Sequence, residues 1–139
     1  MPRARLSRIS REEREEIIGE LFEAITSLKT KKDTVEFLVG LLSPSEILML
    51  ARRIQVAHML LEDEKYRTIC DSIDVGSSTI AGVSRWLESS ESDVFKERSE
   101  SLGNKRGRGN KRKRYYRGIL DPYRQLNVLQ DFLDGISKQ

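Results

Sequence analysis

The sequence predicts an all-α protein, and three observations support this class. Aromatic residues make up only 6% of the 139 residues, and there are three prolines. Long stretches are rich in leucine, glutamate, lysine, arginine and alanine, which favour helix over sheet. Apolar residues recur at spacings of three and four, the repeat of an amphipathic helix.

Two amphipathic helices are expected in the N-terminal part of the chain. The first runs over about residues 10–28, with an apolar face opposite a row of glutamates. It should end where residues 29–32 place cations at the negative end of the helix dipole. The second runs over about residues 34–42, with Asp33 placed to cap its free amides. The apolar face of the first helix consists of Ile17, Ile18, Leu21, Phe22, Ile25 and Leu28.

A capping box opens the third expected helix. Ser43 is the N-cap, Pro44 is the first helical residue and Glu46 is the third. Over residues 47–61 this helix is apolar around most of its circumference. It must therefore be central to a core, or to a core plus a dimer interface.

Residues 66–83 follow the pattern of a helix-turn-helix motif. Two short helices, residues 66–73 and 77–87, are separated by a turn short enough to make them cross steeply. Cys70 is expected where the helices cross, as a small buried side chain. Asp74 is expected to take the left-handed backbone conformation that usually requires glycine. The interior positions that hold the two helices together are Ile69, Ile73, Val75, Ile80 and Val83.

The second helix of this motif has the features of a DNA recognition helix. Its first turn carries Ser77, Ser78 and Thr79, short polar side chains that can reach base edges in the major groove. Its first amides can approach a phosphate. The alternative is a plain helical hairpin in a small α domain. The residues of the motif expected to contact the DNA backbone are Tyr66, Arg67 and Arg85.

A basic tract lies between residues 103 and 118, which hold eight basic residues and no acidic one. The rest of the chain has 17 basic and 22 acidic residues, so this tract alone makes the protein basic. We expect residues 89–118 to be a flexible arm that binds nucleic-acid phosphates, with a solvated linker as the alternative. The expected phosphate contacts of the arm are Lys105, Arg106, Arg108, Lys111, Arg112, Lys113 and Arg114.

The last segment, residues 119–139, is expected to form an amphipathic helix. Asp121 and Pro122 provide a cap and a first-position proline, and Gly135 provides a C-terminal cap. Its apolar face must pack on something, so the helix over residues 122–135 is a candidate docking element for a protein partner. The face consists of Tyr123, Leu126, Leu129, Phe132 and Leu133.

Several of these stretches resemble the tryptophan repressor superfamily, and most of all its TrpR-related members of unassigned ligand. The resemblance lies in residues 41–46 (Leu-Leu-Ser-Pro-Ser-Glu), 51–53 (Ala-Arg-Arg), 60–61 (Leu-Leu) and 76–80 (Gly-Ser-Ser-Thr-Ile). It covers about residues 21–87, although the family's glycine ahead of the motif is Asp63 here. It implies an intertwined homodimer, formed by residues 10–88, that places two recognition helices in successive major grooves.

The resemblance also implies a ligand site, in which the tryptophan repressor holds its indole between two arginines. Arg53 matches the first arginine, and Ser43 replaces a threonine near the ligand amine. The second arginine is Gly82 here and the adjacent glycine is Val83, so half of the clamp is missing. Ser43 and Arg53 form a candidate effector pocket, but we do not expect L-tryptophan in it. Arg53 is instead expected to pair with Glu46 or with a partner carboxylate.

The composition excludes several classes of protein. No run of about 18 apolar residues exists and the N-terminus is charged, which excludes membrane spans and secretory signals and leads us to expect a cytoplasmic protein. One cysteine and one histidine give no basis for a metal site, and no nucleophile–base pair or phosphate-binding loop is visible. We therefore expect no catalytic residues, no resident cofactor and no enzyme activity.

Together these features predict a sequence-specific transcription regulator that binds double-stranded DNA through the helix over residues 77–87. A repressor that occupies promoter DNA is the simplest form. One alternative is a non-enzymatic adaptor, or a replication- or polymerase-associated interaction module, on the same helical scaffold. Another is a protein that binds single-stranded nucleic acid or RNA through the basic tract.

Overall fold

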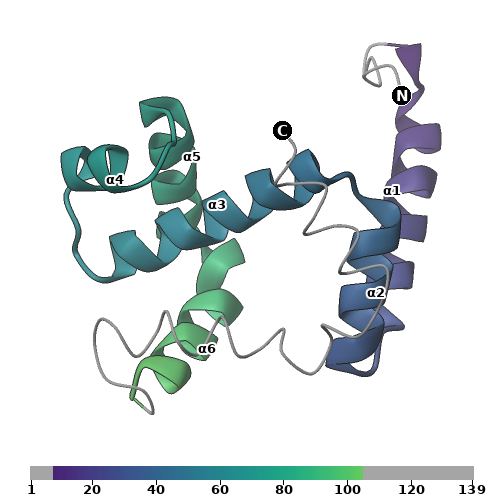
Figure 1. Ribbon diagram of the computed structural model, residues 1–139. Coiled ribbons are helices and arrows are strands. Elements are labelled where there is room, and N and C mark those ends of the chain that lie inside the picture. Colours follow the sequence, from purple (N-terminus) through teal and green to yellow (C-terminus); the bar gives the residue numbers. More distant parts are fainter. Residues whose placement is uncertain (1–7, 105–139) are drawn as a thin grey trace.

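The computed structural model describes residues 8–104, which form helices joined by short turns and contain no strand. The all-α class is therefore confirmed. The elements are α1 (Arg11–Thr26), α2 (Lys31–Leu41), α3 (Pro44–Leu61), α4 (Tyr66–Ser72), α5 (Ser77–Glu88), the short 3₁₀ helix η2 (Ser90–Ser92) and α6 (Asp93–Asn104). Figure 1 shows α3 as the long central helix, with α1 and α2 at one end and the α4–α5 pair at the other.

The first two helices begin with side-chain caps. Ser10 Oγ accepts a hydrogen bond from the Glu13 amide at 3.1 Å. In α2 the N-cap is Thr30, and Asp33 is the third residue of a capping box. The prediction that Asp33 is the cap was wrong, because the Thr30 hydroxyl accepts the Asp33 amide while the Asp33 carboxylate accepts the Thr30 amide. The hydroxyl and the amide of Thr30 hold the pKa of Asp33 below its usual value.

The capping box predicted at the start of α3 is confirmed. The Glu46 amide donates to Ser43 Oγ at 3.3 Å, and the Glu46 carboxylate accepts the Ser43 amide at 2.8 Å. The Ser43 hydroxyl donates to the same carboxylate at 2.9 Å. These hydrogen bonds, the backbone one foremost, lower the pKa of Glu46. The Ser43 hydroxyl is therefore occupied within its own helix.

The core lies at the C-terminal half of α3, where this helix packs against α5 and where α5 meets α4. Its centre is small for a chain of this length, which limits the stability that one chain can reach alone. The buried side chains are Val56, Ala57, Ile69, Ile73, Ile80 and Val83. The partly buried side chains packed around them are Met59, Leu60, Val75, Trp86, Leu87 and Phe95.

The other end of the molecule leaves its apolar side chains open. Neither α1 nor α2 has a buried residue. The apolar face predicted for α1 is present, but Phe22 is 60% exposed, and Met49 on the first half of α3 is 67% exposed. Apolar faces this open are typical of interaction surfaces. Further exposed apolar side chains on α1, α2 and α3 are Ile17, Ile18, Leu21, Ile25, Leu41, Leu48, Leu50 and Ile54.

The α4–α5 pair has the predicted helix-turn-helix arrangement, with α4 crossing α5 steeply (Figure 1). Four of the five interior positions are buried and Val75 is half-buried. Cys70, however, is exposed, so its predicted burial was wrong. Ile69 and Ile73, four residues apart, form the buried face of α4, and Cys70 lies about 100° around the helix from Ile69.

The turn between α4 and α5 also differs from the expectation. Asp74 does not have a positive φ. The chain leaves α4 at Ile73 and enters α5 at Gly76, both in extended conformation, and the Val75 amide donates to the Ile73 carbonyl at 2.9 Å. This tight turn reverses the chain without a left-handed residue.

The left-handed residue lies instead at the end of α3. Asp63 has φ 60°, which favours glycine. Its amide donates to the Leu60 carbonyl at 3.0 Å, and the Glu64 amide donates to the Met59 carbonyl at 3.1 Å. These two hydrogen bonds form a Schellman motif, in which glycine is the usual residue at the Asp63 position. The loop therefore keeps the backbone shape that a glycine would give it.

Replacing Asp63 with glycine is expected to stabilise the protein by about 1 kcal/mol, because it removes the steric cost of the left-handed conformation. Asp63→Val should destabilise it by about 1–2 kcal/mol for the same reason. Thermal unfolding followed by the fluorescence of Trp86, the single tryptophan of the chain, measures both effects. Asp74→Gly is the matched control and should give no gain. A gain for Asp74→Gly equal to that for Asp63→Gly would contradict this account.

Residues 90–104, expected as the start of a flexible polar segment, are helical. Their order comes from Phe95, which packs against the core, and from Ser92, which is completely buried. The packing of Phe95 and the burial of Ser92 thus order this segment despite its polar composition. The basic tract from residue 105 onward and the helix expected over residues 119–139 lie outside the described residues.

Candidate nucleic-acid interface

The start of α5 is open to solvent, as a recognition helix requires. Ser77 and Ser78 are exposed and Thr79 is half-buried. The N-cap is Gly76, and no side chain caps the first amides of α5, in contrast to α1, α2 and α3. A Cβ added at Gly76 would meet only Ser78 Oγ, at 3.8 Å, so the protein's own packing does not require glycine here. Free amides at an unobstructed helix start can bind an anion such as a phosphate.

The outward face of α5 continues beyond its first turn. Ile80 and Val83 face the core, and residues about half a helical turn away from them face solvent. Ser78 and Arg85 are seven residues apart, so they share the outward face, with Gly82 between them. Arg85 is exposed and lies in the last turn. The sequence alone presents Gly82 only as a missing ligand contact. On this face Gly82 has no side chain, so the surface between Ser78 and Arg85 is unobstructed.

The start of α4 lies beside α5 and presents the other predicted backbone contacts. Tyr66 is 45% exposed. The Arg67 guanidinium is almost fully exposed and lies 4.0 Å from the Asp71 carboxylate, one helical turn away. An exposed pair at this distance is weak, so Arg67 can exchange Asp71 for a phosphate at little cost. No side chain caps the first amides of α4 either.

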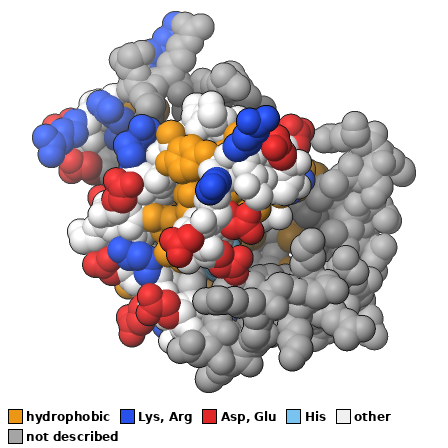
Figure 2. Space-filling model, turned by 90° about the vertical axis from the view of Figure 1, so that its left-hand side faces the viewer, with side chains coloured by type: hydrophobic (Ala, Val, Ile, Leu, Met, Phe, Trp, Pro, Cys, Tyr) orange, Lys and Arg blue, Asp and Glu red, His pale blue; other side chains and the backbone are white. Residues whose placement is uncertain are grey.

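The electrostatics of this face are balanced rather than basic. Figure 2, which looks onto the end of the molecule that carries α4 and α5, shows basic and acidic side chains interspersed around a strip of apolar ones. Residues 8–104 hold 13 basic and 19 acidic side chains. The net charge of the described residues therefore does not attract nucleic acid.

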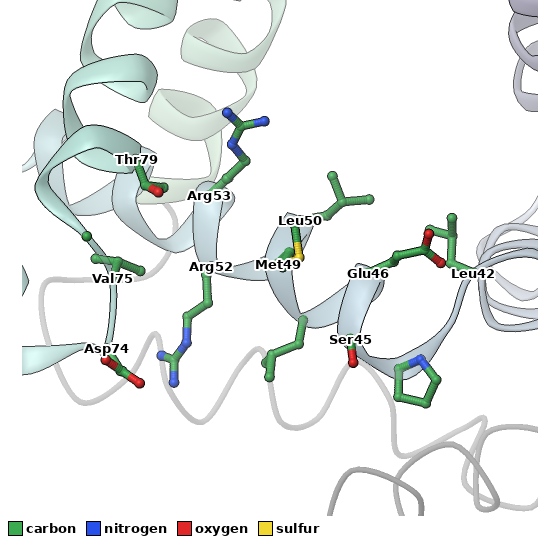
Figure 3. A pocket seen from close by; sticks show the side chains of 13 residues that line it. Leu42, Ser45, Glu46, Met49, Leu50, Arg52, Arg53, Asp74, Val75 and Thr79 are labelled. Atoms are coloured by element: carbon green, nitrogen blue, oxygen red, sulfur yellow. The ribbon is translucent and has the colours of Figure 1, made fainter. Parts of the chain in front are cut away.

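A groove of about 900 Å³ lies between α3 and the first turn of α5. Figure 3 shows Arg53 and Thr79 together on one side of it, and Arg52 and Asp74 on the other. Arg53, the candidate effector contact, is exposed and lines this groove. Ser43, the second candidate, is not among the lining residues, and its hydroxyl is bound to Glu46.

The expected pairing of Arg53 with Glu46 is absent. The Glu46 carboxylate is held by the amide and hydroxyl of Ser43 at the start of the helix, seven residues from Arg53. Arg52, which was not among the predicted site residues, donates to the Gln55 side chain at 2.8 Å and lines the same groove. The lining of the groove thus combines two guanidinium groups, the carboxyl groups of Glu46 and Asp74, and apolar side chains. Such a lining can accept a ligand with an apolar body and polar groups.

The model of the family described as "Trp repressor protein" matches residues 16–99 of the chain, from the first half of α1 into α6. This is well over half of its length and includes the whole helix-turn-helix pair. The chain belongs to this family. The match extends past residue 88 and includes the first part of α6.

A relative in Bacillus subtilis (strain 168), named "Uncharacterized protein YerC", is 36% identical over 70 residues. The aligned part is 50% of this chain and 67% of the relative. No solved structure matches the chain significantly. As a Trp repressor family member with an exposed helix-turn-helix face, the protein is a DNA-binding regulator of the helix-turn-helix type.

Two further features of residues 8–104 concern other classes of site. No three histidine, cysteine, aspartate or glutamate side chains in this part of the chain lie close enough together to hold a metal ion. None of its helices combines the length and the apolar character needed to cross a membrane.

Proposed function

We propose that the protein is a cytoplasmic, homodimeric repressor that occupies promoter DNA in a sequence-specific manner. Each subunit inserts the start of α5 into the major groove, where Ser77, Ser78 and Thr79 contact base edges. Tyr66, Arg67 and Arg85 contact the DNA backbone and fix the register of α5. The exposed first turn of α5, free of any side-chain cap, is the observation that carries this proposal.

The dimer is supported by the open apolar side chains of α1, α2 and the first half of α3. The α1 and α2 helices lie at the end of α3 opposite to α4 and α5 (Figure 1). A second copy that covers this end would leave both α5 helices free to face DNA. Two recognition helices one DNA turn apart then bind two half-sites in successive major grooves.

The basic tract supplies affinity that does not depend on sequence. Lys105, Arg106, Arg108, Lys111, Arg112, Lys113 and Arg114 neutralise phosphates and release counterions. This contribution offsets the acidic charge of residues 8–104, which would otherwise weaken binding. The tract thus strengthens binding, and the three hydroxyl side chains in the first turn of α5 select the DNA sequence.

A small-molecule effector would bind in the groove beside α5. Arg53 lies there next to Thr79, so a ligand that contacts Arg53 also reaches the first turn of the recognition helix. Such a ligand would differ from L-tryptophan, because Gly82 and Val83 replace the residues that complete the family's indole clamp. Ser43 can contribute to ligand binding only if its hydroxyl gives up its hydrogen bond to the Glu46 carboxylate.

Selection of bound duplexes from a random library, with and without added amino acids, tests the proposal and identifies the operator. A double variant, Ser78→Ala with Thr79→Ala, should then lower the ratio of operator affinity to random-duplex affinity by roughly tenfold, while random-duplex affinity stays nearly unchanged. Titration of both duplexes by gel shift measures this ratio.

The matched control is Ser84→Ala, which removes a hydroxyl from the same helix but from a position nearer the core. It should leave the ratio unchanged. Equal losses on operator and random duplex for the double variant would count against base contacts by these residues. A selection that enriches no duplex sequence would favour an adaptor role instead.

A further inference from the structure

The last turn of α5 is held by side chains that follow it in the chain. The Trp86 carbonyl accepts a hydrogen bond from Ser89 Oγ at 2.7 Å. The Leu87 carbonyl accepts one from Ser92 Oγ at 3.1 Å and another from Lys96 Nζ at 3.1 Å. Carbonyls at a helix end have no partner within the helix, so these bonds supply what the helix itself cannot.

Lys96 provides the charged part of this cap. Its side chain is 31% exposed, and its ammonium lies 2.8 Å from the Asp93 carboxylate as well as 3.1 Å from the Leu87 carbonyl. Asp93 thereby aims Lys96 at the negative end of the α5 dipole. A hydrogen bond from a charged donor is stronger than one between neutral groups. α6 is thus fastened to the C-terminal end of α5 through Lys96.

Phe95, the neighbour of Lys96, fastens the same two helices by packing. Its ring centre lies 5.2 Å from that of Trp86 on α5 and 5.2 Å from that of His58 on α3, both in tilted geometry. This is the separation of favourable aromatic pairs. Phe95 therefore ties α6 to α3 and to the C-terminal half of α5, two of the three helices that contribute to the core.

We propose that Phe95 and Lys96 are positioning residues for DNA recognition: α6 holds the C-terminal end of α5 so that Ser77, Ser78 and Thr79 enter the groove in a fixed orientation. This inference rests on the proposed function. The start of α5 has no side-chain cap, and Ser77 and Ser78 in its first turn are exposed. Its orientation is therefore set by Ile80 and Val83 in the middle and by α6 at the far end.

The test compares Lys96→Met with Arg98→Met in the full-length chain. Both variants remove one cation from α6, but Arg98 is exposed and makes no ion pair within residues 8–104. Lys96→Met should speed hydrogen exchange of the last-turn amides of α5 by about tenfold and lower the operator-to-random affinity ratio by about fivefold. Arg98→Met should change neither the exchange rate nor the affinity ratio. Lys96→Arg should keep both close to their wild-type values.

Phe95→Leu is the second variant, since it keeps most of the apolar volume and removes the ring contacts. It should lower the affinity ratio at a temperature where Trp86 fluorescence shows the protein fully folded. A merely structural role would lower the unfolding temperature and leave the ratio unchanged, which would overturn the proposal. Unchanged exchange at the end of α5 in Lys96→Met would also overturn it. If the wild-type protein prefers no duplex, the proposed function fails, and the exchange measurement alone decides whether Lys96 holds α5.

Discussion

Replacing Phe22 with glutamate is expected to convert the protein from a dimer to a monomer and to lower its affinity for an operator at least a hundredfold. Phe22 is the most exposed apolar side chain of α1, on a helix with no buried residue. A carboxylate at the centre of an apolar interface would lose its hydration without gaining a partner. In the dimer, binding of the second subunit to its half-site is intramolecular, which raises the affinity by two or more orders of magnitude. Separated subunits lose this gain.

Sedimentation equilibrium measures the mass, and gel shift with the selected operator measures the affinity. Val94→Glu is the matched control, because Val94 is 68% exposed but lies on α6, away from α1. This variant should remain a dimer with nearly unchanged affinity. A Phe22→Glu protein that still sediments as a dimer would show that α1 does not form the interface.

Deleting residues 105–118 is expected to weaken binding to every duplex by about a hundredfold or more at physiological salt. The deletion removes eight basic residues and leaves a chain with more acidic than basic side chains. If all eight contact phosphate, the slope of log affinity against log salt concentration falls in magnitude by about 7 per chain. The deletion begins after Asn104 and so leaves α6 complete.

Gel shifts on operator and random duplex over a series of salt concentrations measure this slope. A chain of unchanged length, with the eight basic residues replaced by glutamine, separates the loss of charge from the loss of a tether. Both chains should keep the operator-to-random ratio, in contrast to the Ser78 and Thr79 variants. An unchanged salt slope would mean that the tract is only a solvated linker.

The sequence predictions were most accurate for features that depend on residues close together in the chain. The capping box of Ser43 and Glu46 was predictable because both partners lie within four residues and their chemistry determines the helix start. The interior positions of the helix-turn-helix pair were predictable from their spacing. At Asp33 the error was to assign the cap to the carboxylate, when Thr30 three residues earlier forms the reciprocal partner.

The errors at Cys70 and Asp74 have a different origin, because both came from fitting residues to a motif. The motif assigns a small residue to the helix crossing and a left-handed residue to the turn. In this chain Ile69 and Ile73 fill the contact, and an extended turn with one short hydrogen bond replaces the left-handed residue. The left-handed conformation is found eleven residues earlier, at Asp63, where a helix end requires it.

The sequence by itself determined which segments are helical up to residue 88, where the capping box of α3 lies, and which faces of the helices are apolar, because these properties depend on residues within one or two turns of each other. Only the tertiary structure decided which apolar faces are buried. It placed the core at the C-terminal half of α3, left α1 open, and joined Lys96 and Phe95 to the end of α5. Such contacts join residues far apart along the helices or across a turn, and their geometry follows from packing that no local pattern encodes.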